Sequence, residues 1–324
     1  MIGLFYGTRP EYIKLQPLLT ALDRKDVDYL LYQVAQHTDL IDGCVSDIVI
    51  DVTPSVGNRL NSIFTSVMSH NLESLDYALV QGDTTTATAV AMSAFHQNIP
   101  VMHLEAGMRT YDKKNPFPEE VNRRIISSLA SIHYCPTESE RDYLVTEGYS
   151  KDSILVTGNT AIDNLQGLES SESNRVLITL HRRENHASMG KWFETIDQIA
   201  KNNPDYEFVF PMHPNPNVQA HKAKLKSVKV LEPLLYFDMR EQIASCAAII
   251  TDSGGIQEEA SFFRKPCFVC RTTTERPCEG SVLCEAPEDL LQSFDVNKEV
   301  TVPTRFGDGR TGERVAEDIS SRMA

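Results

Sequence analysis

Short runs of β-branched, aromatic and aliphatic residues alternate with longer segments of helical periodicity along this chain, and this alternation constrains its fold most. Residues 2–6 form the first such run. The segment after it carries leucines at the i, i+3, i+4, i+7 spacing of one helix face, namely Leu15, Leu18, Leu19 and Leu22. Repetition of strand, turn and helix is typical of α/β proteins with parallel sheets. We therefore predict an α/β fold.

The predicted strands fall into two groups separated by a polar segment. They comprise residues 2–6, 28–34, 77–81, 101–104 and 132–135, then 175–180, 206–210, 228–231, 247–251 and 266–271. Residues 167–174 are Ser-rich and lack periodicity, as linkers do. We predict two Rossmann-like doubly wound domains, residues 1–168 and 175–324, with the last helix a candidate to cross back to the first. Such domains bind ligands in a cleft beyond the carboxyl ends of their strands.

The charge balance excludes several classes of partner. With 31 Lys and Arg against 45 Asp and Glu, the net charge of −14 leaves little basic surface for nucleic acid. No apolar run approaches the roughly 18 to 20 residues that span a bilayer, and residues 1–6 lack the features of a secretory signal. The 7 cysteines are scattered, so we expect reduced thiols. These features predict a soluble, cytoplasmic protein with neither nucleic acid nor membrane as partner.

Two familiar motifs are better explained by packing than by ligand binding. Residues 307–312 match G-x-G-x-x-G, but too little chain follows to build the βαβ unit of a dinucleotide site. Cys267 and Cys270 form a C-x-x-C inside a predicted strand, where residues three apart point to opposite faces. A zinc site would require a second pair, and Cys278 and Cys284 are not spaced as one.

Two strand-to-helix turns have the composition of anion sites. Asp252-Ser253-Gly254-Gly255 follows an apolar strand, and its small residues leave helix N-terminal amides open to a pyrophosphate. The alternative is an ordinary N-cap. Gly7-Thr8-Arg9-Pro10 is a similar turn in the first half, with Lys14 nearby. These two cations either face a phosphate or are solvated helix charges.

Three acidic residues lie in the first half: Asp83, Glu105 and Glu119. Asp83 and Glu105 each follow an apolar strand, so both are expected at the same edge of the sheet. Paired carboxylates suit general acid–base chemistry, whereas a capping Asp and a surface Glu are the structural alternative. His181 and His213 end strands of the second half. Without a metal-binding motif around them, hydrogen bonding to a phosphate or a sugar is the better interpretation.

Together these stretches resemble the non-hydrolysing UDP-N-acetylglucosamine 2-epimerase family. The matches run in the family's order along nearly the whole chain: Gly7-Thr8-Arg9-Pro10-Glu11 with Lys14, Gln36-His37, Gln81-Gly82-Asp83-Thr84, Glu105-Ala106-Gly107-Met108-Arg109, residues 118–123, 181–185, His213-Pro214-Asn215, 252–259 and 273–277.

The resemblance implies a GT-B fold, a homodimer, and interconversion of UDP-GlcNAc and UDP-ManNAc without nicotinamide, metal or other cofactor. It assigns catalysis to residues of the first domain and, from the second, His181, so that the catalytic positions are Asp83, Glu105, Glu119, Arg123 and His181. It assigns UDP binding to Arg9, Lys14, His213, Ser253, Gly254, Gly255, Glu259 and Arg276. It places the uracil against backbone near Leu234 and Met239.

Other functions stay open at this point. A hydrolysing relative would release UDP and free N-acetylmannosamine, and a GT-B glycosyltransferase would share the fold but not need three carboxylates in the first half. A UDP-sugar-binding regulator would lose some of those acids. Many family members are activated by a second UDP-GlcNAc, but here Asp39 and Gly43 stand where glutamines are frequent.

Overall fold

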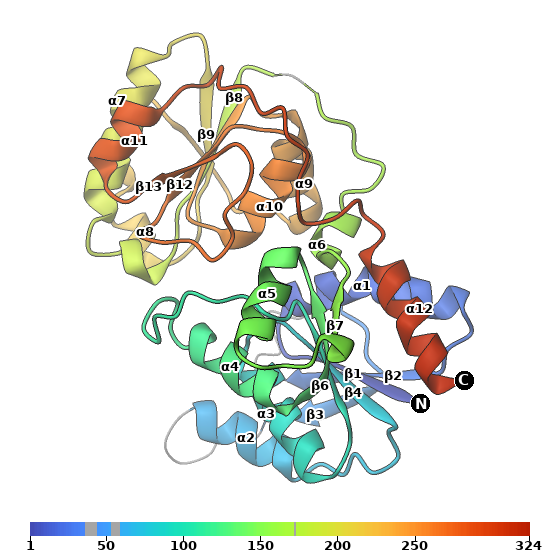
Figure 1. Cartoon of the computed structure of the whole chain (residues 1–324). Coiled ribbons are helices and arrows are strands. Elements are labelled where there is room, and N and C mark those ends of the chain that lie inside the picture. The colour runs from blue at the N-terminus through green and yellow to red at the C-terminus, as the bar shows by residue number, and fades with distance from the viewer. Residues whose placement is uncertain (36–43, 53–58, 172) are drawn as a thin grey trace. The chain divides into compact units, whose positions relative to one another are not determined.

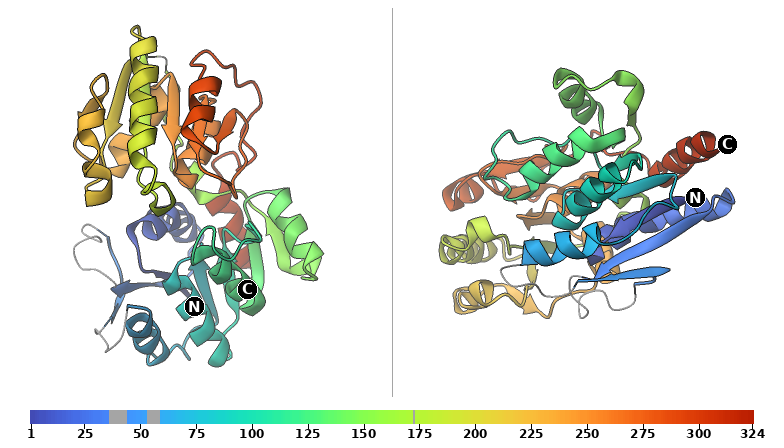
Figure 2. Two further views of the ribbon diagram at one scale, coloured as in Figure 1. Left: turned by 90° about the vertical axis from the view of Figure 1, so that its left-hand side faces the viewer. Right: turned by 90° about the horizontal axis from the view of Figure 1, so that it is seen from below.

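A computed structural model describes residues 1–35, 44–52, 59–171 and 173–324. The chain forms two compact units. The first consists of Met1–Asn164 and Phe306–Ala324, and the second of Leu165–Arg305. Each unit is built on one parallel sheet with helices on both faces (Figures 1 and 2).

In the described part of the first unit, a 7-stranded sheet has the order β3-β2-β1-β4-β5-β6-β7. Its strands are β1 (Ile2–Tyr6), β2 (Tyr29–Ala35), β3 (Ile48–Asp51), β4 (Tyr77–Gln81), β5 (Val101–Leu104), β6 (Ala130–Cys135) and β7 (Ile154–Val156). Its helices are α1 (Arg9–Arg24), α2 (Arg59–Met68), α3 (Thr85–His96), α4 (Glu119–Leu129), α5 (Glu138–Thr146), α6 (Thr160–Asp163) and α12 (Thr311–Met323). The strand order reverses between β1 and β4, which is the switch point where open α/β sheets bind ligands.

In the described part of the second unit, a 6-stranded sheet has the order β10-β9-β8-β11-β12-β13. Its strands are β8 (Arg175–Thr179), β9 (Glu207–Pro211), β10 (Lys229–Leu231), β11 (Ala248–Thr251), β12 (Cys267–Cys270) and β13 (Ser281–Cys284). Its helices are α7 (Met189–Asn202), α8 (Pro216–Gln219), α9 (Tyr236–Ser245), α10 (Gly254–Phe262) and α11 (Pro287–Ser293). Here the order reverses between β8 and β11.

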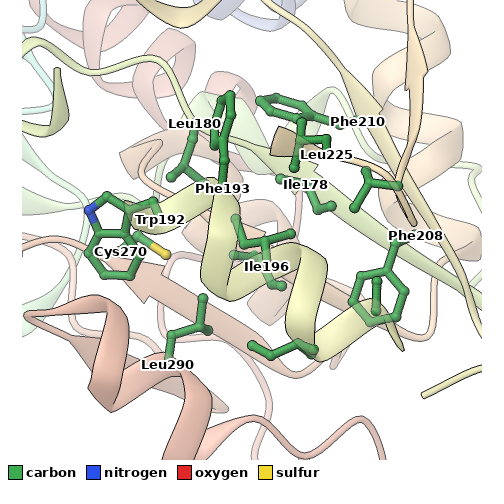
Figure 3. Packing of buried hydrophobic residues seen from close by; sticks show 14 of the residues in the cluster. Ile178, Leu180, Trp192, Phe193, Ile196, Phe208, Phe210, Leu225, Cys270 and Leu290 are labelled. Carbon is green, nitrogen blue, oxygen red and sulfur yellow. The ribbon is translucent and has the colours of Figure 1, made fainter. Parts of the chain in front are cut away.

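Several aromatic residues of the second unit are buried in one cluster between α7 and the sheet (Figure 3). Phe193 of α7 meets Phe210 of β9 edge-on, with ring centroids 5.4 Å apart, and Trp192 lies beside Cys270. Cys270 lies in the same cluster, and all 7 cysteines are free thiols. In the described residues, no helix is long and apolar enough to cross a membrane.

Every strand predicted from the sequence is present, with ends shifted by at most two residues. The prediction missed β3, β7 and β13. These are edge strands of three or four residues, and an edge strand has one unpaired side. They therefore lack the long apolar run that marks a strand buried on both faces.

Residues 306–324 belong to the first unit, so the last helix crosses back, which the sequence left open as an alternative within the predicted range 175–324. Helix α12 packs beside α1 (Figure 1), and its Val315 and Ile319 join Leu15 and Leu18 in one core. The G-x-G-x-x-G match leads into this contact. A Cβ on Gly312 would lie 2.7 Å from the backbone carbonyl of Pro17, so only glycine permits this approach of the two helices.

Candidate functional site

At the switch point of the first sheet, Glu11 joins two neighbouring turns. Its carboxylate accepts hydrogen bonds from Gly7 N at 3.0 Å, from Thr8 Oγ1 at 2.7 Å and from Thr84 Oγ1 at 2.6 Å. The side chain is almost fully buried, and this burial raises the pKa of the Glu11 carboxyl. The β1–α1 turn, which carries half-buried Arg9, is thereby fixed to the β4–α3 turn, which carries Asp83.

Asp83 is the second residue after β4 and is held by α4. Its Oδ2 lies 2.8 Å from Nε of Arg123, and its backbone oxygen accepts a hydrogen bond from Asn122 Nδ2 at 2.8 Å. Gly82 before it has φ +70°, a left-handed conformation that favours glycine. Both the side chain and the main chain of Asp83 therefore have fixed directions.

Glu105 directly follows β5, the strand beside β4, and lies next to the Asp83 turn. Its Oε2 is 2.5 Å from Nζ of Lys14 and also accepts a hydrogen bond from Gln81 Nε2. A Cβ on Gly82 would lie 4.0 Å from the same oxygen. Glu105 itself has φ +67°, which is uncommon for a non-glycine residue and typical of functional sites. Two carboxylates, each with a cation in contact, thus lie at adjacent strand ends.

Helix α4 brings two further groups to this edge. Glu119, its first residue, is half-buried and shares a helix face with Arg123 one turn later. Arg123 also contacts Glu120 at 3.5 Å, and buried Glu120 accepts the backbone N–H groups of Thr110 and Tyr111. Arg123 is therefore fixed between two carboxylates, and only the Asp83 carboxylate is partly exposed.

In the second unit, Asp252 fixes the loop that follows β8. Its buried carboxylate accepts hydrogen bonds from His181 N at 3.0 Å, Arg182 N at 2.8 Å and Asn185 Nδ2 at 3.0 Å. The His181 ring stacks on His213, with centroids 5.1 Å apart and planes 18° from parallel. Burial and the neighbouring His181 lower the pKa of His213. A neutral His213 is therefore favoured near pH 7.

The α10 turn has the geometry expected of an anion site. Ser253 precedes the helix, and Gly254 and Gly255 form its first turn. Arg276 lies directly over Gly254, because a Cβ there would be 2.9 Å from its Nε. Arg276 is ion-paired with buried Glu258. Helix N-terminal amides and a guanidinium fixed beside them suit a phosphate group.

Glu259, Leu234 and Met239 lie around the start of α9. Glu259 is buried in α10 and accepts a hydrogen bond from the Tyr236 hydroxyl at 3.3 Å. Leu234 is half-buried in the loop before α9. Met239 lies in the first turn of α9, and its N–H donates to Leu235 O at 2.9 Å. The backbone N–H of Met239 is therefore already occupied, and a contact between Met239 and a nucleotide base would involve another atom of this residue.

The structure gathers Arg9, Lys14, Asp83, Glu105, Glu119 and Arg123 at one sheet edge of the first unit. It gathers His181, His213, Ser253, Gly254, Gly255 and Arg276 at strand ends of the second. Sequence reasoning missed the two buried acids that organise these edges, Glu11 and Asp252, although both lie inside the quoted motifs. Gln36, His37, Asp39 and Gly43 lie outside the described residues.

Two doubly wound units with charged strand ends define a nucleotide-binding type of α/β protein. The family model of UDP-N-acetylglucosamine 2-epimerase matches residues 51–320. A UDP-N-acetylglucosamine 2-epimerase from Neisseria meningitidis is 38% identical, covering 97% of this chain and 97% of its own. One from Campylobacter jejuni is 34% identical, covering 97% and 96%. The chain belongs to the UDP-N-acetylglucosamine 2-epimerase family, as its motifs predicted.

Solved structures agree with this assignment. A putative UDP-N-acetylglucosamine 2-epimerase from Listeria monocytogenes superposes with a TM-score of 0.90 at 32% identity, covering 99% of this chain and 96% of that one. The Neisseria meningitidis UDP-GlcNAc 2-epimerase bound to UDP-GlcNAc gives 0.88 at 32% identity, with 99% of both chains covered. Acinetobacter baumannii MurG, at 12% identity and a TM-score of 0.60, shares the fold alone. The predicted GT-B-type fold of two parallel α/β units is confirmed.

Proposed function

We propose that this protein is a non-hydrolysing UDP-GlcNAc 2-epimerase that interconverts UDP-GlcNAc and UDP-ManNAc. Family membership supports the reaction class. The observation that carries the proposal is the pair Asp83 and Glu105, two carboxylates at adjacent strand ends, each in contact with a cation. Such a pair can exchange a proton with a substrate carbon while its charges stay balanced.

The chemistry of the sugar explains why acids and cations are both needed. C2 is not adjacent to a carbonyl, so its proton cannot be removed by simple enolisation. The C2–H bond breaks as UDP leaves C1 from the opposite face, and a 2-acetamidoglucal forms. Return of a proton to the other face of C2, and of UDP to C1, gives the epimer. Acid–base groups must therefore act at C2, and a cationic, amide-rich pocket must stabilise the departing diphosphate.

In this proposal the second unit holds most of the UDP. Arg276, the amides of Gly254 and Gly255, Ser253 and His213 bind the diphosphate, and Glu259 accepts the ribose hydroxyls. The uracil lies against backbone near Leu234 and Met239. The fixed guanidinium of Arg276 over the open α10 turn supports this assignment.

The first unit supplies the chemistry at C2. Asp83 and Glu105 handle the protons, Arg123 orients Asp83, and Glu119 assists, together with His181 of the second unit. Arg9 and Lys14 add positive charge for the diphosphate. Lys14 contacts Glu105, so its ammonium also neutralises that carboxylate. The reaction uses no nicotinamide, metal or other cofactor, and the active enzyme is a cytoplasmic homodimer.

The alternative functions are a hydrolysing 2-epimerase and a GT-B glycosyltransferase that uses a UDP-sugar. A glycosyltransferase needs the residues that bind the nucleotide. It does not need a second carboxylate, paired with a cation, among the residues that face the sugar. The proximity of Glu105 to the Asp83 turn therefore favours the epimerase.

Proton NMR of the purified protein with UDP-GlcNAc in heavy water tests the proposal. Formation of UDP-ManNAc with deuterium at C2 is expected. Accumulation of UDP and free sugar would instead identify a hydrolysing enzyme, and binding of UDP without turnover would favour the transferase. Asp83→Asn should lower deuterium exchange at C2 by about 10²–10⁴-fold and leave UDP binding nearly unchanged. Exchange at the wild-type rate in this variant would refute the role of Asp83.

A further inference from the structure

A fully buried histidine lies beneath the turn that carries Asp83. His103 is the third residue of β5, and its Nε2 is 2.8 Å from the backbone oxygen of Gly82. A carbonyl oxygen can only accept a hydrogen bond, so Nε2 carries the proton and donates it. Because burial lowers the pKa of His103 to about 4, the imidazole is neutral near pH 7.

This hydrogen bond fixes the peptide group that leads into Asp83. The N–H of Gly82 donates to Leu104 O at 2.9 Å, so β5 holds Gly82 on both its N–H and its carbonyl side. Gly82 also has the left-handed φ of +70°, which glycine adopts without strain. The direction in which Asp83 leaves the strand, beside Glu105, is set by this peptide group.

The two ring nitrogens of His103 differ in their surroundings. Among the described residues, Nδ1 of His103 has no hydrogen-bond partner, although its side chain is 0% exposed, and Nδ1 of buried His133 is unpartnered too. The feature that distinguishes His103 is therefore the hydrogen bond that its Nε2 donates to Gly82 O. An aliphatic side chain in its place would leave that buried oxygen without its donor.

We propose that His103 is a positioning residue for the proposed epimerase reaction, which acts by donating its Nε2–H to Gly82 O and so holding Asp83 beside Glu105. The expected effect on kcat rests on the proposed function. The structural consequence, that the hydrogen bond from His103 helps to hold the turn at residues 82–84, is independent of the reaction.

Three variants separate positioning from packing. His103→Leu keeps the volume and removes the donor. His103→Gln keeps an N–H donor at the distance of Nε2 from the backbone. His133→Leu is the matched control, because His133 on β6 is equally buried, lies opposite His103 in the sheet, and packs its ring against Tyr149 at 5.2 Å.

Steady-state conversion of UDP-GlcNAc should show a loss in kcat of about 10²-fold for His103→Leu, with KM changed by less than about threefold, because misplacement of a reacting group slows chemistry. His103→Gln should restore kcat to within about tenfold, and His133→Leu should match wild type. Because Gly82 O loses its donor, the thermal midpoint of His103→Leu should fall below that of wild type, so the kinetics are compared at a temperature where every variant is folded. Wild-type kcat in His103→Leu, or equal losses in His103→Gln, would overturn the proposal.

Hydrogen–deuterium exchange of the peptide that spans residues 82–84 tests the same proposal without turnover. We expect faster exchange in His103→Leu and wild-type exchange in His103→Gln and His133→Leu. Unchanged exchange in His103→Leu would overturn the positioning role even if the protein is an epimerase. If wild type does not epimerise UDP-GlcNAc but His103→Leu still exchanges faster, the proposed function is refuted, and His103 remains the residue that holds the turn.

Discussion

Replacing Gly254 by alanine should weaken UDP binding by displacing Arg276. The added Cβ would lie 2.9 Å from Nε and 3.0 Å from Cδ of Arg276. These distances are about half an ångström short of ordinary van der Waals contact, so the guanidinium must move. Arg276 is 8% exposed and ion-paired with Glu258, and it therefore has little room to adapt without leaving the α10 turn.

The magnitude follows from the bond that this movement breaks. A hydrogen bond between a guanidinium and a phosphate contributes about 1.5–3 kcal/mol. Loss of one such bond corresponds to a rise in the Kd for UDP of about 10- to 150-fold. Calorimetric titration with UDP, at a temperature where both proteins are folded, measures this change directly.

Gly190→Ala is the matched control for this experiment. Gly190 also lies in the first turn of a helix of the second unit, but a Cβ there would meet the flexible ends of Lys224 and His221 at 3.1 and 3.2 Å. We expect wild-type UDP affinity in this variant. A Kd within about twofold of wild type for Gly254→Ala would refute the contribution of Arg276 to UDP binding.

Two further predictions concern stability. Gly312→Ala should lower the free energy of unfolding by about 1–3 kcal/mol, because the added Cβ would contact the backbone of Pro17, which cannot rotate away. Urea denaturation measures this change, and a variant as stable as wild type would contradict the packing of α12 on α1. The pH dependence of unfolding should include His103, whose pKa is lowered to about 4 by burial. Because the unfolded chain binds this proton near pH 6.5, stability is lost as pH falls from about 6.5 to 4, by up to about 3 kcal/mol. His103→Leu should lose less stability over this range, and an identical pH profile in the variant would contradict the burial of a neutral ring.

The central strands were predictable because strands buried on both faces must be apolar throughout. Residues 77–81 and 101–104 were predicted with their exact bounds for this reason. The edge strand β3 has only one of its four residues buried, and such a short, mixed segment has no distinctive pattern. The last helix was expected as a candidate to cross back to the first unit, but an amphipathic pattern does not specify which surface a helix covers. The contact of α12 with α1 is given by the structure.

The candidate site was likewise predictable only in part. Asp83 and Glu105 were expected at one edge because each follows an apolar strand, and this follows from the geometry of parallel sheets. The cation that each contacts could not be predicted, since Lys14 is 91 residues from Glu105 and Arg123 is 40 residues from Asp83. A buried acid such as Asp252 looks like a surface acid in the sequence. Its role became visible only when its three backbone and side-chain donors were located.

In the proposed reaction, UDP leaves C1 and returns during epimerisation. UDP-GlcNAc that carries ¹⁸O in the oxygen between C1 and the β-phosphorus tests this step, with ³¹P NMR as the readout. Departure of UDP makes the three terminal oxygens of its β-phosphate equivalent on rotation. We expect the label to move from the bridging to the non-bridging positions as UDP-ManNAc forms. Epimerisation with the label retained in the bridge of both sugars would contradict it.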